Sequence, residues 1–158
     1  MQRLVKLLKF LLPITLSVVT VQADTRAQTT IKKDIDLMPF SLYINNIKSE
    51  KGGQLIVFVF LEDGFPKVHE QTLLKFTSPI DTNQMTMQIK IPRKADFAIK
   101  VLHDENMDGK VTKNWTGIFP KDGLGFSNGA KISFGPPSFD DAKVNIKDGL
   151  SSNISILY

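Results

Sequence analysis

The chain reads Leu-Ile-Val-Phe-Val-Phe-Leu from Leu55 to Leu61, a run of consecutive apolar residues rich in β-branched and aromatic types. Gly52-Gly53 precede this run and Asp63-Gly64 follow it, and both dipeptides are typical of turns. A strand with one face in water alternates apolar and polar side chains, whereas this run does not alternate. The stretch therefore predicts a central β-strand with protein covering both of its faces.

Other short segments also have the pattern of β-strands. Residues 40–44 alternate apolar and polar side chains, as a half-buried strand does. Four more segments are predicted as strands: residues 85–91, 97–102, 142–146 and 154–158. Residues 68–76 fit either a short strand or one helical turn.

Six or seven short strands with Gly, Pro and Asp turns between them predict an all-β fold. We expect an antiparallel β-sandwich of immunoglobulin-like or transthyretin-like kind over residues 39–158. An outer-membrane barrel is the competing all-β fold. Its strands alternate apolar and polar residues over about ten positions, and residues 55–61 do not alternate, so the sandwich is favoured.

The N-terminus has the composition of a secretory signal peptide. Arg3, Lys6 and Lys9 form a basic start, an apolar run extends from Leu7 to Val21, and small residues end at Ala23. The run is shorter than the roughly 20 residues of a membrane-spanning helix, so a cleaved peptide is favoured over a retained anchor. We therefore predict a signal peptide over residues 1–23 and a flexible linker over 24–38. The mature chain is predicted to have no transmembrane span and to be periplasmic or secreted.

The net charge and the absence of cysteine exclude several classes of binding and modification. The 158-residue chain has 20 Lys and Arg against 16 Asp and Glu, a net charge of +4. Three of the basic residues lie in the predicted signal peptide, so the remaining chain has a net charge of +1 and nucleic-acid binding is not predicted. The chain has no Cys, which excludes disulfides and lipid attachment to a cysteine.

Four short blocks stand out between residues 103 and 142. They are His103-Asp104-x-Asn106-x-Asp108-Gly109-Lys110, Gly117-Ile118-x-Pro120, Gly125-Phe126-Ser127-Asn128 and Gly135-Pro136-Pro137-Ser138-Phe139-x-Asp141-Ala142. In this order the blocks resemble domain-of-unknown-function family 2141, a family of small exported bacterial proteins. The resemblance implies a periplasmic or secreted β-sandwich and leaves the activity open.

The first block also has the spacing of half a calcium-binding loop. Asp104, Asn106 and Asp108 place oxygen-bearing side chains at alternate positions, and Gly109 follows where such loops turn sharply. Lys110 would offer its carbonyl oxygen and Thr112 its hydroxyl. These five residues, Asp104, Asn106, Asp108, Lys110 and Thr112, are the candidate ligands of a weak calcium site.

Trp115 occupies the position where a calcium loop places a bidentate carboxylate, so a distant acid such as Asp140 or Asp141 would have to complete the site. The same Asn, Asp and Gly residues are also what a tight hairpin turn requires. Both interpretations stay open at this point, and calcium is the one candidate cofactor.

The remaining residues of the blocks are predicted to build an ordered loop over residues 103–141. They are His103, Gly109, Gly117, Pro120, Gly125, Phe126, Ser127, Asn128, Pro136, Pro137, Phe139 and Asp141. Four aromatic residues, Phe119, Phe126, Phe134 and Phe139, are expected to pin this loop onto the sandwich, with a ligand cleft as the alternative.

These observations predict a non-enzymatic binding or envelope-associated module with loop 103–141 as its working surface; they specify neither its ligand nor its partner. The alternative is a hydrolase that acts on a glycoside through paired carboxylates. Its candidates are Asp104, Glu105, Asp108, Asp140 and Asp141. The chain lacks Cys and Gly-x-Ser-x-Gly and has two histidines, so nucleophile arrangements do not support the hydrolase.

Overall fold

The computed structural model describes residues 35–117 and 120–158. The predicted signal peptide and most of the predicted linker lie outside these residues. The strands are β1 (Leu37–Asn45), β2 (Gln54–Phe60), β3 (Leu74–Pro79), β4 (Met85–Pro92), β5 (Phe97–Asp104), β6 (Gly123–Phe126), β7 (Lys143–Val144) and β8 (Ser151–Ser155). The helical turns are η1 (Ser49–Lys51), η2 (His69–Gln71), η3 (Ser127–Gly129), α2 (Phe139–Ala142) and η4 (Ile146–Asp148).

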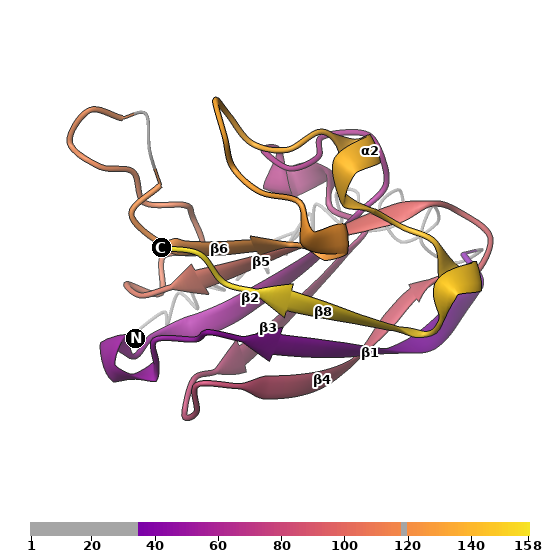
Figure 1. The fold of residues 1–158 in the computed structure, drawn as a ribbon, viewed down its shortest axis with the longest axis horizontal. Coiled ribbons are helices and arrows are strands. Elements are labelled where there is room, and N and C mark those ends of the chain that lie inside the picture. The colour runs from indigo at the N-terminus through magenta and orange to yellow at the C-terminus, as the bar shows by residue number, and fades with distance from the viewer. Residues whose placement is uncertain (1–34, 118–119) are drawn as a thin grey trace, which may run out of the picture. The chain divides into compact units, whose positions relative to one another are not determined.

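The strands form two sheets that pack as a sandwich, which confirms the predicted all-β fold (Figure 1). One sheet has the order β4-β1-β8, and the other has the order β3-β2-β5-β6 with β7 beside β5. Neighbouring strands are antiparallel except for β1 and β8, which run parallel. The expected fully antiparallel arrangement is therefore wrong for this one pair. Between β1 and β8 the chain passes through both sheets. It can therefore return to the first sheet so that β8 runs in the same direction as β1.

The first core lies between the two sheets. Every second residue of β1 points inward, and Phe40, Leu42 and Ile44 are buried. They belong to the same cluster as Leu55 and Val57 of β2, on the facing sheet. Removing this much apolar surface from water is the main source of stability in a domain without disulfides.

A second core covers the opposite face of the five-stranded sheet. Ile56, Phe58 and Phe60 of β2 point away from the first core and are buried against the long β5–β6 and β6–β7 connections. Phe65 and Phe139 pack onto this cluster with their rings edge to face, 5.9 Å apart. Strand β2 is therefore buried on both faces, as its unbroken apolar sequence predicts.

Several predicted boundaries change in the structure. The strands expected at residues 40–44, 85–91 and 97–102 are present as parts of β1, β4 and β5. The strand predicted over residues 142–146 is wrong beyond Lys143–Val144, because α2 ends at Ala142 and η4 begins at Ile146. Residues 68–76 contain both alternatives, the turn η2 and the start of β3.

Strand β6 was expected to be part of a loop. Two of its four residues are Gly, which weakens the pattern of a strand in the sequence. Strand β1 begins at Leu37, inside the predicted linker, and β8 ends at Ser155 rather than at Tyr158. Among the described residues, no helix is long and apolar enough to cross a membrane.

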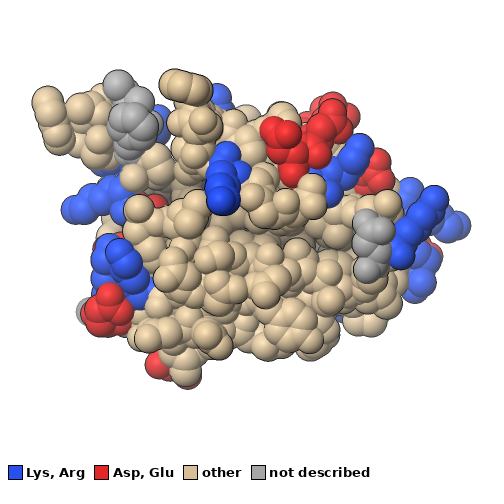
Figure 2. Space-filling view, in the orientation of Figure 1, with Lys and Arg blue, Asp and Glu red and all other residues tan. Residues whose placement is uncertain are grey.

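The outward face of the three-stranded sheet is polar but largely uncharged. Ser41, Tyr43 and Asn45 of β1 alternate with its buried residues, and Asn153 of β8 lies beside them. Figure 2 shows that the middle of this surface, over β1 and β8, carries no Lys, Arg, Asp or Glu. The charged side chains gather around its edges.

Candidate functional site

A groove of about 670 Å³ lies on the side of the five-stranded sheet that the long connections cover. It is bounded by the segment before η2, by the β5–β6 connection and by the connection between η3 and α2, which project from the same side of the molecule in Figure 1. Its described lining residues are Pro66, Lys67, His69, Glu70, Lys100, Lys110, Val111, Lys113, Pro120, Leu124, Phe126, Ile132, Ser133, Phe134, Gly135 and Pro136.

Lys100 of β5 lines this groove although its side chain is almost fully buried, at 4% exposure. The register places it between Phe58 of β2 and Phe126 of β6. Its Nζ donates to the carbonyl oxygen of Pro66 and contacts Nε2 of His69, each at 2.9 Å. Burial lowers the pKa of Lys100 to about 8, because the charged form loses its hydration.

His69 is the second partner of the Lys100 ammonium or amine nitrogen. Its ring stacks on Phe58, with the ring centres 4.1 Å apart. The pKa of His69 is lowered to about 4, mainly because the ring is partly buried. The neighbouring positive charge of Lys100 lowers this pKa further. The imidazole is therefore neutral near pH 7. A contribution from the backbone of Gly109 opposes the lowering of this pKa. A neutral ring has one acceptor nitrogen, and Nε2 is the one that faces Nζ of Lys100.

The charged residues of the groove are mostly basic. Lys67, Lys110 and Lys113 line it together with Lys100, and Glu70 is the one acid among the described lining residues. Leu124, Phe126 and other apolar side chains form the rest of the lining. The groove thus combines apolar walls with an excess of positive charge.

The predicted calcium ligands form a turn at the end of β5. Asp104 is fully buried, and its carboxylate accepts hydrogen bonds from the N–H groups of Asp108 (3.2 Å) and Gly109 (2.8 Å) and from Nε2 of Gln54 (2.8 Å). The Asn106 amide donates to Asp108, whose carboxylate accepts from the N–H of Lys110. The oxygens of this loop therefore have donors within the protein, which fits the turn.

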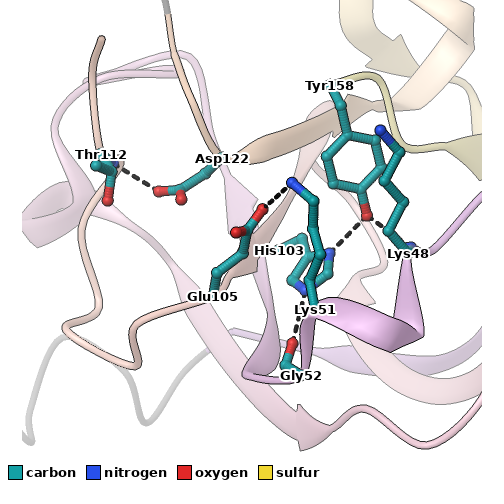
Figure 3. Close-up of polar contacts among 8 residues, drawn as sticks. All are labelled: Lys48, Lys51, Gly52, His103, Glu105, Thr112, Asp122 and Tyr158. Atoms are coloured by element: carbon teal, nitrogen blue, oxygen red, sulfur yellow. Dashed lines mark hydrogen bonds and ion pairs between the residues drawn. The ribbon is translucent and has the colours of Figure 1, made fainter. Parts of the chain in front are cut away.

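Thr112, the last candidate ligand, has a different hydrogen-bond partner. Its N–H donates to the carboxylate of Asp122, at 2.6 Å (Figure 3). Burial raises the pKa of Asp122, and the nearby Glu105 and Asp104 add to this, while the bonds from Thr112 oppose it. Within residues 35–117 and 120–158, no group of three His, Cys, Asp or Glu side chains could hold a metal ion. The predicted calcium site also uses amide, carbonyl and hydroxyl oxygens, so it stays a prediction.

His103 is part of a hydrogen-bonded network at the C-terminus of the chain (Figure 3). Its Nε2 lies 2.8 Å from the carbonyl oxygen of Gly52, which can only accept, so Nε2 carries the hydrogen. Its Nδ1 then accepts from the hydroxyl of Tyr158, which in turn accepts from the N–H of Lys48. Both ring nitrogens are satisfied and the ring is fully buried, which supports a structural role.

The third and fourth blocks of the sequence meet in space. Ser127 accepts from the N–H of Ile99 at 2.8 Å and donates to the carbonyl oxygen of Ala142. Asn128 donates to the carbonyl oxygen of Asp141 at 3.0 Å. These bonds tie the end of β6 to α2, so the predicted structural role of Ser127 and Asn128 is supported.

The remaining block residues have mixed surroundings. Asp141 and Ser138 form a capping box at the start of α2, and Pro137 is buried. Gly117 has a φ of 72°, and Pro120 and Pro136 line the groove. Phe126 and Phe139 pack onto the second core as expected. Phe134 is fully exposed, so it does not pin the loop, and Phe119 lies outside the described residues.

The model of one protein family matches residues 42–154, which span β1 to β8. The family is described as an uncharacterized protein conserved in bacteria, DUF2141. The chain belongs to DUF2141. The resemblance carried by the four blocks is thereby confirmed. Comparison with curated proteins and with solved structures found no match.

Three polar residues of this DUF2141 domain were not predicted as site residues: Lys100 and Asp122, which are buried, and His69, which is partly buried. Lys100 had a signal in the sequence, since it is the one charged residue in the apolar run from Phe97 to Leu102. His69 has no motif around it, and Asp122 lies in a stretch rich in Gly and Lys. Their packing depends on contacts between segments far apart in the chain.

Proposed function

We propose that this DUF2141 protein is an exported, non-enzymatic binding module that holds a small amphipathic anion in the groove around Lys100. The observation that carries the proposal is a buried lysine in a groove with apolar walls. A buried ammonium group without a carboxylate partner is costly, and an anionic ligand would offset that cost.

The rest of the groove supports the same class of ligand. Lys67, Lys110 and Lys113 add positive charge, which attracts anions and speeds their approach. The apolar walls, including Leu124, Phe126 and Ile132, suit a hydrocarbon chain. Much of this lining comes from loop 103–141, which agrees with its expected role as the working surface.

The hydrolase alternative has less support. Asp104 is bonded within its turn, Asp140 pairs with Lys143 at 3.2 Å, and Asp141 caps α2. None of the five proposed carboxylates is among the described lining residues of the groove. A glycosidase needs two carboxyl groups facing one concave site.

Export is part of the proposal and is supported by the basic start, the apolar run and the small residues that end at Ala23. Weak calcium binding by the 104–112 loop stays a prediction. The hydrogen bonds that occupy the Asp104 carboxylate favour the turn over the metal.

Titration calorimetry with octanoate tests the binding function. We expect octanoate to bind the mature protein and Lys100→Met to weaken the affinity at least about tenfold, which corresponds to about 1.4 kcal/mol. Lys90→Met is the matched control, because Lys90 is exposed on β4 in the other sheet and should leave the affinity unchanged.

A neutral ligand with the same chain, 1-octanol, should bind more weakly than octanoate if the charge of the groove contributes. Equal octanoate affinity in the wild type and in Lys100→Met would contradict the proposal. So would the absence of octanoate binding up to tens of millimolar.

A further inference from the structure

The contacts of Lys100 differ from those of an ordinary buried lysine. Among the described residues, the ion pairs involve Lys51, Arg93 and Lys143, and Lys100 is in none of them. Its partners are instead a carbonyl oxygen, from Pro66, and the neutral ring of His69. Neither partner carries a charge that would hold the ammonium form.

The two hydrogen bonds around Nζ can both be made by the neutral amine. An uncharged amine has two N–H groups and one lone pair, whereas an ammonium group has three N–H groups and no lone pair. The two acceptors, Pro66 and Nε2 of His69, take the two N–H groups of the amine. Its lone pair then remains available to a molecule in the groove.

The lowered pKa of Lys100 makes the neutral amine accessible near neutral pH, with the ammonium form still the larger share. Burial lowers the pKa of Lys100 to about 8. At pH 7.4 Lys100 is therefore uncharged in roughly a fifth of the molecules, whereas an ordinary lysine is uncharged in about a thousandth of them. His69, with its pKa lowered to about 4, stays neutral and keeps its acceptor. Desolvation in an apolar pocket is a known way to make a lysine nucleophilic.

We propose that Lys100 captures carbonyl compounds with an apolar chain as a reversible imine within the groove. This inference rests on the proposed function, because it uses the same groove, and it names the ligand class more closely. The Nζ lone pair attacks the carbonyl carbon and forms a carbinolamine. The two amine hydrogens leave with the former carbonyl oxygen as one water, and a carbon–nitrogen double bond replaces the carbon–oxygen double bond.

The lining of the groove fits a 2-oxo acid best within this class. Its carbonyl group would meet Lys100, its carboxylate would be attracted by Lys67, Lys110 and Lys113, and its chain would lie on the apolar walls. Protonation of the imine leaves one N–H, which Pro66 or His69 can accept. His69 is thus a positioning residue, since it holds Nζ through a hydrogen bond.

The test is reductive trapping of the mature protein with 2-oxooctanoate and cyanoborohydride, followed by peptide mapping. Reduction converts the imine into a stable secondary amine with the mass of the ligand chain. We expect the adduct on Lys100 at least about tenfold faster than on exposed lysines such as Lys90. The trapping rate should rise with pH around a midpoint near 8, because only the uncharged amine reacts.

Two variants sharpen the test. Lys100→Arg keeps a positive charge but should lose the adduct, whereas Lys90→Arg should keep it. His69→Phe keeps an aromatic ring on Phe58 but removes one of the two acceptors of Nζ, and it should slow trapping at Lys100 and shift the pH midpoint.

Adducts spread evenly over the lysines, or none on Lys100 in the folded wild type, would overturn the inference. Octanoate has no reactive carbonyl, so its binding separates the two proposals. Octanoate binding without a 2-oxooctanoate adduct would refute imine formation and leave the proposed function intact. An adduct on Lys100 without octanoate binding would refute the anion site and support carbonyl capture.

Discussion

At the scale of single residues, Asp104 is the side chain on which the 104–109 loop is built. It ends β5, it is fully buried, and its two carboxylate oxygens accept from two backbone N–H groups and one amide. Each hydrogen bond to a charged acceptor contributes to stability only if both partners stay in place. The hydrogen bonds of Asp104 therefore support the turn.

Asp104→Ala should lower the free energy of unfolding by about 3 kcal/mol in calcium-free buffer, because the donors of Asp108 and Gly109 lose their acceptor. Denaturant unfolding measures this. Asp108→Ala is the control, since Asp108 is exposed, and its effect should be clearly smaller.

Calcium itself distinguishes the two interpretations of this loop. If the loop is only a turn, the melting temperature should stay constant up to tens of millimolar calcium. A rise of several degrees that Asp104→Ala abolishes would restore the metal site, because an ion that binds only the folded state stabilises it. If the loop is a metal site, Asp104→Ala should also lower the free energy of unfolding only slightly in calcium-free buffer.

Lys100 should make stability depend on pH in the alkaline range. Its pKa is about 8 in the folded state and 10.5 when unperturbed, so the unfolded chain binds more protons between these values. The free energy of unfolding should therefore rise with pH from 8 to 10.5, by at most on the order of 3 kcal/mol. Below pH 8 the cost of burying the charged Lys100 is fully present.

Denaturant unfolding of the wild type and of Lys100→Met across this range isolates the contribution of Lys100. The variant should lack the rise, and Lys90→Met should keep it. Parallel profiles for the wild type and Lys100→Met would show that Lys100 is charged in the folded state over the whole range.

At the scale of elements, β6 depends on the absence of side chains at two positions. A Cβ at Gly125 would lie 2.5 Å from Cγ2 of Ile154, and one at Gly123 would lie 2.5 Å from Cγ2 of Ile156. The chain that follows β8 also bridges to β6 at Leu124 and Leu157. The two glycines therefore allow the end of the chain to close over the five-stranded sheet.

Gly125→Ala should destabilise the domain by about 1–3 kcal/mol, because the added methyl group forces β6 and β8 apart. Gly135→Ala is the matched control: its Cβ would meet nothing within 4 Å, and no positive φ requires a glycine there. Thermal melting of both variants measures the difference. Equal melting temperatures would mean that β8 is not packed on β6 as described.

At the scale of the whole molecule, residues 35–158 form one compact unit with two cores on either side of the five-stranded sheet. The first core, between the sheets, holds the sandwich together. The second core attaches the long connections that build the groove. The groove therefore rests on a rigid sheet, while its rim comes from loops that can differ in sequence without loss of the fold.

Export is the prediction that belongs to the whole chain. The purified native protein should begin at Asp24 or within a few residues of it, because Ala23 ends the predicted signal peptide. Intact-mass measurement determines this start. Met1 retained on protein from the cytoplasmic fraction would contradict both export and a periplasmic or secreted location.

The sequence alone determined the sheet elements with the strongest patterns. Residues 55–61 predicted a strand buried on both faces, and residues 40–44 and 85–91 predicted half-buried strands, since period and composition are local properties of the chain. The four blocks also identified the family. Asn, Asp and Gly in the 104–109 loop left the turn and the metal open, because both use the same residues.

Only the tertiary structure decided the parts that depend on distant segments. Strand β6 is formed through its pairing with β5. The strand predicted over residues 142–146 is shortened to Lys143–Val144, because α2, which Ser138 and Asp141 cap, ends at Ala142 and η4 begins at Ile146. The groove exists because β5, β6 and three connections meet on one face of the sheet. The apolar run around Lys100 is a local signal, but its burial between Phe58 and Phe126 is a consequence of strand register, which the local sequence does not contain.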